Sequence, residues 1–243
     1  MTNKKAVQII GYKNSGKTHL MVNLCSMLKS RGLRVGCIKY SHHSLDKRDS
    51  DTEKLSNKAD VVVGISPSSS QVFFNKKKSF LDVLTYLDVD IILIEGGRRE
   101  IDFLPRIVVA NHEEDIELTD ELTIGVYLRN KDLKFKDHEI SFIDKEENLV
   151  EDILNKGFLL PGIDCGACGY NSCREMGIKI LKNEESVQSC MSMNTPEVKV
   201  EVDGVPLNLN PFVQNIVKST IEGLLSNLKG YHKGEINIQI KTK

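Results

Sequence analysis

The sequence lacks a charge excess, a long apolar run and a signal peptide. Its 243 residues hold 33 Lys and Arg against 34 Asp and Glu, whereas general nucleic-acid or membrane-surface binders usually show a large basic excess. The longest apolar runs, 61–65 and 91–94, are far shorter than the roughly 20 residues that a membrane span requires. The basic N-terminus leads into too short an apolar stretch for a signal peptide. We therefore expect a cytoplasmic protein that binds neither nucleic acid nor membrane.

Cysteine is scarce over most of the chain and concentrated in one segment. Cys25 and Cys37 lie alone in apolar helix and strand contexts, where we expect core residues. The other four cysteines have the spacing C-x₂-C-x₄-C-x₁₆-C and are Cys165, Cys168, Cys173 and Cys190. In a chain without a secretion signal, such clustering indicates a metal or cluster site before a disulfide framework.

The four clustered thiols suit either tetrahedral zinc or an iron–sulfur cluster. Structural zinc sites usually show paired C-x₂-C motifs, and only one such motif is present here. Small residues between Cys165 and Cys168 let backbone N–H groups approach bridging sulfides. We therefore expect these cysteines to hold a [4Fe-4S] cluster, with zinc and metal-free structural thiols as the alternatives.

The order of predicted elements divides the chain into three parts. In residues 1–157, short β-branched runs alternate with amphipathic helices, which favours an α/β sheet with parallel central strands and helices on both faces. We expect strands at 6–10, 34–39, 60–65, 71–74, 91–95, 106–110, 122–128 and 139–143, and helices at 17–30, 51–58, 79–87 and 147–155. A hairpin around Val61 and Val72 adds antiparallel strands, so we expect a mixed sheet.

The two C-terminal parts are smaller. Residues 158–195 hold the four cysteines and show little periodicity, so we expect a small iron–sulfur domain there. Residues 196–243 are predicted to form a ββαβ unit, with strands at 198–202 and 205–209, a helix at 212–228 and a last strand at 236–240. The apolar stripe of that helix is expected to pack on the rest of the chain or on a partner.

Residues 11–18, GYKNSGKT, match the phosphate-binding pattern G-x-x-x-x-G-K-[ST] without substitution. The motif follows a predicted strand and opens a predicted helix, where backbone N–H groups and the helix N-terminus can hold phosphates. We expect Lys17 at the β- and γ-phosphates and the Thr18 hydroxyl on Mg²⁺. The expected nucleotide contacts are Gly11, Lys13, Asn14, Ser15, Gly16, Lys17 and Thr18.

A carboxylate at the end of a neighbouring strand is expected to complete the magnesium site. Asp90 and Glu95 lie at opposite ends of the predicted strand 91–95, about 16 Å apart, so only one can reach the phosphates. Ligands bind at the carboxyl ends of parallel strands, which selects Glu95. Asp90 is expected to be a solvated strand start.

The loop 39–50 after the second predicted strand leaves the same edge of the sheet. Its His42, His43 and Asp49 are candidates for contacts with nucleotide or substrate, with a solvated loop and a metal site as alternatives. The base is not assigned by sequence, because Asn130-Lys131-Asp132 is one residue short of the N-K-x-D pattern of guanine-specific P-loop proteins.

These elements, in this order, resemble the molybdopterin-guanine dinucleotide biosynthesis protein B (MobB) family. That family has GxxxSGKT, K-H-x-H-H, K-D-S, E-G-F-K and P-K-I segments. The corresponding residues here are GYKNSGKT, Lys39-Tyr40-Ser41-His42-His43, Arg48-Asp49-Ser50, Glu95-Gly96-Gly97-Arg98 and Pro105-Arg106-Ile107. Tyr40 replaces the first His of the family pattern, and Gly97 replaces its aromatic residue.

The resemblance implies a homodimeric GTP-binding protein with weak GTPase activity. Such a protein assists a separate molybdenum cofactor nucleotidyltransferase, which attaches GMP to molybdopterin. By position, it implies that Lys17 serves the phosphates, that Thr18 and Glu95 serve Mg²⁺, and that His42, His43 and Asp49 face the nucleotide or the pterin. Separately, CGACGYNSC with Cys190 is similar to the [4Fe-4S] domains of electron-transfer subunits and corrinoid iron–sulfur proteins.

We therefore expect a GTP-binding accessory protein of molybdenum or tungsten cofactor biosynthesis with a fused [4Fe-4S] cluster. The alternative from the enzyme class is a P-loop ATPase that inserts or reduces a metallocentre and uses the cluster as an electron relay. A third possibility is a binding module in which the nucleotide only gates partner docking.

Overall fold

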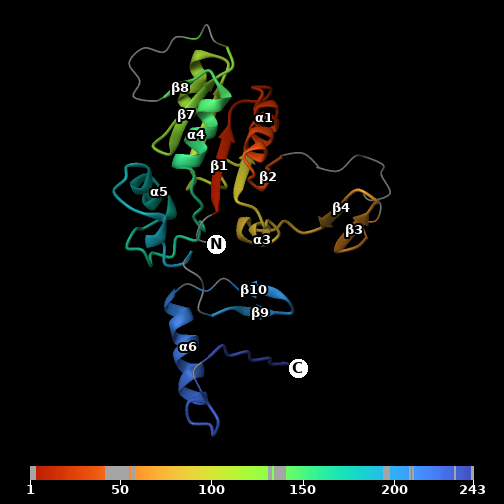
Figure 1. Ribbon diagram of the computed structural model, residues 1–243, viewed down its shortest axis with the longest axis vertical. Coiled ribbons are helices and arrows are strands. Elements are labelled where there is room, and N and C mark those ends of the chain that lie inside the picture. The colour runs from red at the N-terminus through yellow and green to blue at the C-terminus, as the bar shows by residue number, and fades with distance from the viewer. Residues whose placement is uncertain are drawn as a thin grey trace.

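The computed structural model describes residues 4–41, 55, 58–130, 133, 141–193, 198–207, 209, 211–232 and 234–241. Its centre is a six-stranded sheet (Figure 1). In spatial order the strands are β2 (Val35–Lys39), β5 (Ile91–Glu95), β1 (Lys5–Ile10), β6 (Arg106–Ala110), β7 (Thr123–Leu128) and β8 (Phe142–Ile143). Each neighbouring pair in this order is parallel. β5 and β6 are buried along their whole length, as expected for parallel strands covered on both faces.

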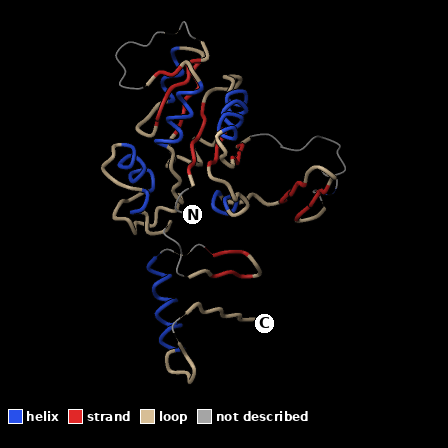
Figure 2. The backbone as a smooth tube through the Cα atoms, in the orientation of Figure 1, coloured by secondary structure: helices blue, strands red, loops and turns tan. Residues whose placement is uncertain are grey.

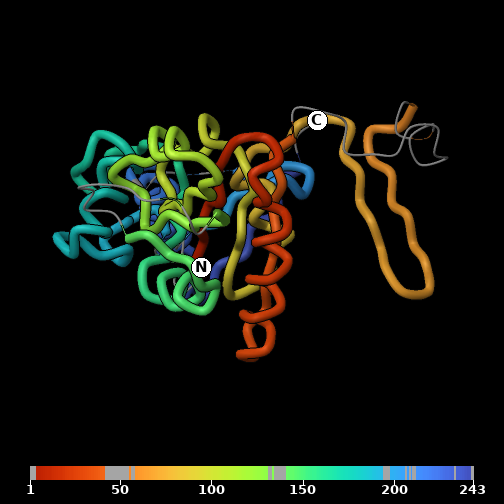
Figure 3. The backbone as a smooth tube through the Cα atoms, turned by 90° about the horizontal axis from the view of Figure 1, so that it is seen from above, coloured from red at the N-terminus to blue at the C-terminus, as the bar shows by residue number. Residues whose placement is uncertain are grey.

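The predicted hairpin forms, but it lies outside this sheet. β3 (Val61–Ile65) and β4 (Ser70–Phe74) pair antiparallel in a sheet of their own. The hairpin extends away from the central sheet in two perpendicular views (Figures 1 and 3). Val63 and Ile65 are exposed, so the hairpin has no buried face that would join it to the core. The expected antiparallel strands therefore do not mix into the central sheet, which is parallel.

Helices cover both faces of the sheet, as the alternating pattern predicted. α1 (Lys17–Ser30) and α4 (Glu146–Lys156) pack on one face, where Val7 and Ile9 of β1 lie. α3 (Phe80–Leu84) and α5 (Cys173–Leu181) pack on the other, where Ala6 lies. The buried residues of α1 lie on one apolar stripe at helical spacing: Leu20, Met21, Leu24 and Leu28. Two 3₁₀ turns, Glu113–Leu118 and Val187–Ser189, complete this part of the fold.

Two helices differ from the prediction. α3 ends at Leu84 rather than at residue 87, and the Ser79 side chain caps its start. α5 lies in the cysteine segment, where no helix was expected. The Ser172 hydroxyl accepts a hydrogen bond from the Glu175 N–H at 3.1 Å, which fixes the first turn of α5. Met176 of α5 is fully buried in the cluster that also contains Ile92. The cysteine segment therefore shares a hydrophobic core with the sheet.

The C-terminal part is partly as predicted (Figure 2). β9 (Val200–Val202) and β10 (Val205–Leu207) form an antiparallel hairpin, and α6 (Pro211–Leu225) follows. The last predicted strand, 236–240, is wrong: this segment is irregular, and Ile240 is 79% exposed. Alternating isoleucines favour a strand only where a neighbour pairs with them. Phe212 and Leu224 of α6 are also exposed, so the described part of the chain leaves this stripe uncovered.

Some predictions lie outside the described residues. They are most of the helix 51–58, the first residues of the strand 139–143, and His42, His43 and Asp49. No helix of the described part is long and apolar enough to span a membrane.

Candidate functional site

The phosphate-binding loop lies between β1 and α1, at the edge of the sheet where the parallel strands end. Gly16 directly precedes α1 and has a left-handed backbone (φ 94°). A Cβ on Gly16 would collide with the guanidinium of Arg129, which follows β7. The left-handed backbone favours glycine here, whereas the flexible Arg129 side chain could move aside for a Cβ. Arg129 was not predicted from the sequence, although it directly follows a strand of the central sheet at this edge.

Lys17 is folded over the loop that it belongs to. Its Nζ donates hydrogen bonds to the carbonyls of Gly11 (2.9 Å) and Tyr12 (2.6 Å) and to the hydroxyl of Ser15 (3.3 Å). Burial lowers the pKa of Lys17; the carboxylate of Glu95 opposes this effect, and the neighbouring ammonium of Lys39 adds to it. The Lys17 ammonium is thus poorly solvated, which favours an anionic ligand beside it.

Thr18, Glu95 and Lys39 form a connected polar group next to the loop. The Thr18 hydroxyl donates to Glu95 Oε2 at 2.8 Å, and Lys39 Nζ lies 3.1 Å from Glu95 Oε1. The Glu95 side chain is only 11% exposed, whereas that of Lys39 is 52% exposed. A hydroxyl beside a buried carboxylate is a donor set that suits Mg²⁺. The sequence singled out Thr18 and Glu95 but not Lys39, which ends β2 in register with Glu95.

The other predicted residues divide into three groups. Ser15 is buried inside the loop, while Lys13 and Asn14 are exposed on it. Asp90 lies at the opposite end of β5 and forms an ion pair with Arg34 at 3.0 Å, so it is far from the loop as expected. His42, His43 and Asp49 fall outside the described residues.

A second site is the pocket around the cysteines. Cys165, Cys168, Cys173 and Cys190 all line it, together with Pro161, Tyr170 and Met191. Cys173 and Cys190 are buried, and burial raises the pKa of both thiols, that of Cys190 to about 11. Cys165 Sγ lies 3.2 Å from the hydroxyl of Ser192.

The pocket fits a thiolate-bound metal group by its donor set but not by its present geometry. Four thiols face one cavity and no histidine lines it, which matches the ligands of iron–sulfur clusters and of zinc. Among the described residues, however, no three Cys, His, Asp or Glu side chains are close enough together to hold a metal ion. Metal sites are often completed only by the metal itself. The four thiols would have to converge by local movement.

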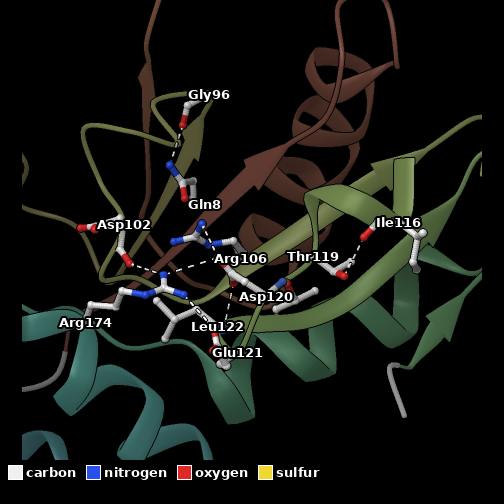
Figure 4. Close-up of polar contacts among 11 residues, drawn as sticks. Gln8, Gly96, Asp102, Arg106, Ile116, Thr119, Asp120, Glu121, Leu122 and Arg174 are labelled. Carbon is white, nitrogen blue, oxygen red and sulfur yellow. Dashed lines mark hydrogen bonds and ion pairs between the residues drawn. The ribbon is translucent and has the colours of Figure 1, made fainter. Parts of the chain in front are cut away.

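A buried polar network connects the sheet to the cysteine segment (Figure 4). Arg106 of β6 is 1% exposed, and its Nη1 lies 3.0 Å from Asp120 Oδ2. Arg174, the residue after Cys173, lies 3.4 Å from the same Asp120 oxygen and 2.8 Å from Glu121. Arg174 also donates to the carbonyl of Asp102 at 3.0 Å. Asp120 therefore joins a buried and a half-buried guanidinium.

The side chain of Gln8 lies next to this network in the sheet but shares no hydrogen bond with Arg106. Gln8 of β1 is fully buried and donates to the carbonyl of Gly96 at 2.8 Å, next to Glu95. Gln8 is the register partner of Arg106. Gln8 Oε1 and the Nε and Nη2 of Arg106 make no hydrogen bond with the described residues. Burial lowers the pKa of Arg106, and Asp120 opposes this effect.

Comparisons with known families agree with this arrangement. Residues 6–126 match the family "MobB: Molybdopterin guanine dinucleotide synthesis protein B". Residues 160–192, which contain all four clustered cysteines, match the family "Putative Fe-S cluster". A crystal structure of Bacillus subtilis MobB has a TM-score of 0.51 at 21% identity, over 61% of this chain and 97% of that one. This similarity shows a shared fold.

Two curated relatives are similar in sequence. The "Putative molybdopterin-guanine dinucleotide biosynthesis adapter protein" of Methanocaldococcus jannaschii is 29% identical over 233 residues, which is 93% of this chain and 92% of that protein. The "Probable molybdopterin-guanine dinucleotide biosynthesis adapter protein" of Bacillus subtilis is 24% identical over 142 residues, or 55% of this chain and 80% of that protein. Residues 6–126 of the chain are therefore a domain of the MobB family, followed by a segment that matches an iron–sulfur family.

Proposed function

We propose that this protein is a GTP-binding adaptor of molybdenum or tungsten cofactor biosynthesis, which assists the attachment of GMP to molybdopterin. The observation that carries the proposal is that Lys17, folded over its loop, lies near the hydrogen-bonded pair of Thr18 and Glu95 at the sheet edge of a MobB-family domain. The similarity to the archaeal protein named as an adapter extends over nearly the whole chain, which supports the same role for the complete molecule.

In this proposal the nucleotide phosphates lie in the loop formed by residues 11–18. On binding, Lys17 would exchange its loop carbonyl partners for the β- and γ-phosphates, because phosphate oxygens are the stronger acceptors. Thr18 and Glu95 would ligate Mg²⁺ directly or through water. Lys39 and Arg129 bring two further cations to this edge and would balance the phosphate charge.

The remaining roles follow from the family resemblance. His42, His43 and Asp49 are proposed to face the nucleotide or the pterin. The partners are the molybdenum cofactor nucleotidyltransferase and molybdopterin, and the protein is proposed to act as a homodimer with only weak GTPase activity. We further propose residues 1–157, 158–195 and 196–243 as the functional divisions of the chain, although the first two share one hydrophobic cluster.

The cysteine pocket is proposed to hold a [4Fe-4S] cluster through Cys165, Cys168, Cys173 and Cys190. The bound cluster would supply redox chemistry or a rigid docking surface, while this chain contributes the thiolates and an apolar wall. The protein should be purified anaerobically and assayed for iron, sulfide and zinc. We expect about four iron and four sulfide per chain, with loss in Cys190→Ser and retention in the control Cys25→Ser. Zinc without sulfide would reject the cluster.

The nucleotide is tested by calorimetry on the anaerobic full-length chain, with GTP and ATP and with and without Mg²⁺. The proposal predicts Mg²⁺-dependent GTP binding at least about tenfold tighter than ATP binding, a difference of about 1.4 kcal/mol. Preference for ATP would instead support the metallocentre ATPase, whose cluster potential should then shift with nucleotide.

The adaptor role needs a separate assay. Purified nucleotidyltransferase is incubated with molybdopterin, GTP and Mg²⁺, and the guanine dinucleotide formed is measured with and without this protein. We expect more product with the wild type and no gain with Lys17→Ala. An equal product yield in all three reactions would reject the adaptor role while leaving the nucleotide site intact.

A further inference from the structure

Two cysteines outside the pocket, one in α1 and one in β2, lie against each other. The Sγ atoms of Cys25 and Cys37 are 3.3 Å apart. Both were expected to be core residues, but Cys37 is exposed and Cys25 only half-buried, so that expectation is wrong. The reason is that β2 is an edge strand of the sheet, and α1 covers only part of it.

The contact between Cys25 and Cys37 is set by a helix and a strand rather than by a loop. Cys37 is in register with Leu93 of β5, and Leu93 lies in the hydrophobic cluster beneath α1. Cys37 therefore points to the face that α1 covers. Cys25 packs against the same cluster from the helix side. Two regular elements thus hold the thiols together, and neither thiol lines the cysteine pocket.

We propose that Cys25 and Cys37 are a modification site, a thiol pair that low-molecular-weight disulfides convert into an intramolecular disulfide. The Sγ separation must fall from 3.3 Å to about 2.05 Å, a small movement for one exposed and one half-buried side chain. An oxidant in solution can reach Cys37, because this residue is exposed. Cys25 is already in contact with it, so the pair can close without a large rearrangement.

The reaction is thiol–disulfide exchange in two steps. One thiolate of the pair attacks the oxidant R–S–S–R, which forms a mixed disulfide and releases one R–S⁻. The second thiolate then attacks the bound sulfur of the chain, which closes the Cys25–Cys37 bond and releases the second R–S⁻. The two thiols lose two protons and two electrons, and the oxidant becomes two R–SH.

Cys37 is exposed as a residue, but partial burial of its sulfur, reinforced by the hydrogen bond with Cys25, raises its pKa to about 12. Its thiolate is therefore scarce at neutral pH, so its attack on an oxidant is slow and needs the oxidant in excess. Closure would tie α1, which begins with Lys17 and Thr18, to β2, which ends with Lys39. The modification thus joins two elements that form the candidate nucleotide site.

The test uses the full chain with its metal site loaded, treated anaerobically with excess glutathione disulfide and then alkylated. Trypsin separates the two thiols, because Cys25 lies in peptide 18–29 and Cys37 in peptide 35–39. We expect most of peptide 18–29 to be disulfide-linked to peptide 35–39, and the link to disappear on reduction. Cys37→Ser, at an exposed position, is the matched control and should give no such linked peptide.

Two results would overturn the proposal. One is that both peptides from the oxidised wild type are recovered only as alkylated thiols or as separate glutathione adducts. The other is that either cysteine is recovered linked to a pocket cysteine rather than to its neighbour. Both results come from the wild-type chain, so neither depends on whether a variant folds. The outcome is also independent of which nucleotide binds.

Discussion

The ring of Tyr40 lies against Gly97, so that a Cβ on Gly97 would be 2.7 Å from Cδ2 of Tyr40. Tyr40 follows β2, and Gly97 is the second residue after β5, so the contact joins two loops at the nucleotide edge. Both residues stand at positions where the sequence departs from the MobB motifs, with Tyr for His and Gly for an aromatic residue. The two departures are in contact, and the ring of Tyr40 now fills the space beside residue 97.

Gly97→Ala should therefore destabilise the protein by about 2 kcal/mol. Part of this cost comes from the left-handed backbone of Gly97 (φ 68°), where a Cβ costs roughly 1–2 kcal/mol. The rest comes from the collision with Tyr40. Tyr40→Ala removes only the collision, so the double variant should be more stable than the sum of the single effects. Urea unfolding of the four proteins measures the coupling; strictly additive effects would contradict the contact.

Lys17 should be indispensable for nucleotide binding, whereas an exposed control lysine should not be. Lys17 contacts the loop at three points and is proposed to move onto the phosphates. Hydrogen bonds to charged groups contribute about 1.5–3 kcal/mol, so Lys17→Ala should weaken GTP binding by roughly 10- to 150-fold. Lys29→Ala removes an exposed lysine in the last turn of α1 and is the matched control, with an expected change below about threefold. Equal losses in both variants would indicate a nonspecific charge effect.

GTP binding should take up protons at alkaline pH. Burial lowers the pKa of Lys17 in the free chain, with Glu95 opposing, and a bound phosphate would raise this pKa again. The affinity is then highest at pH values below the free-chain pKa and falls as the pH rises between the free and bound values. Calorimetry at about pH 9 in two buffers of different ionisation enthalpy measures the uptake. No buffer dependence would mean that Lys17 does not approach the phosphates.

Local sequence patterns predicted correctly the helices, strands and turns that are specified by their own residues. The strand 6–10, the glycine-rich loop and the helix 17–30 were foreseen with nearly correct bounds, because each has its own periodicity and a defined start. The preference for Glu95 over Asp90 rested on the direction of a parallel strand, and the structure brings Glu95 against Thr18. Lys39 and Arg129 were missed because their relevance arises only when separate strands meet at one edge.

The errors in the sequence-based predictions have a common physical cause. Where the local sequence signal is weak, tertiary packing determines the secondary structure and the exposure of a residue. α5 was missed in a segment that shows little periodicity, and the packing of Met176 on the sheet stabilises it as a helix. Residues 236–240 have a strand pattern, but none of the described residues pairs with them. Cys37 looked like a core residue, since the sequence does not show that β2 is an edge strand.

Asp120 should be more important for stability than either arginine that it contacts. Asp120→Ala leaves Arg106 buried without its carboxylate, a change that typically costs about 3–5 kcal/mol. Arg174→Ala removes a side chain that is 29% exposed, so its cost should stay near 1 kcal/mol. The double variant Arg106→Met/Asp120→Ala replaces the buried charge by an apolar side chain and should be more stable than Asp120→Ala alone.

Urea unfolding of the full chain checks this order. The matched control is Glu184→Ala, which breaks the exposed pair with Lys179 (2.6 Å) and should change the unfolding free energy by less than about 0.5 kcal/mol. If Asp120→Ala lowered the unfolding free energy as little as this control, Arg106 would have to gain another hydrogen-bond partner by local repacking of the folded variant. Gln8 Oε1 is the nearest candidate by strand register, and Gln8→Leu combined with Asp120→Ala would then restore the large loss.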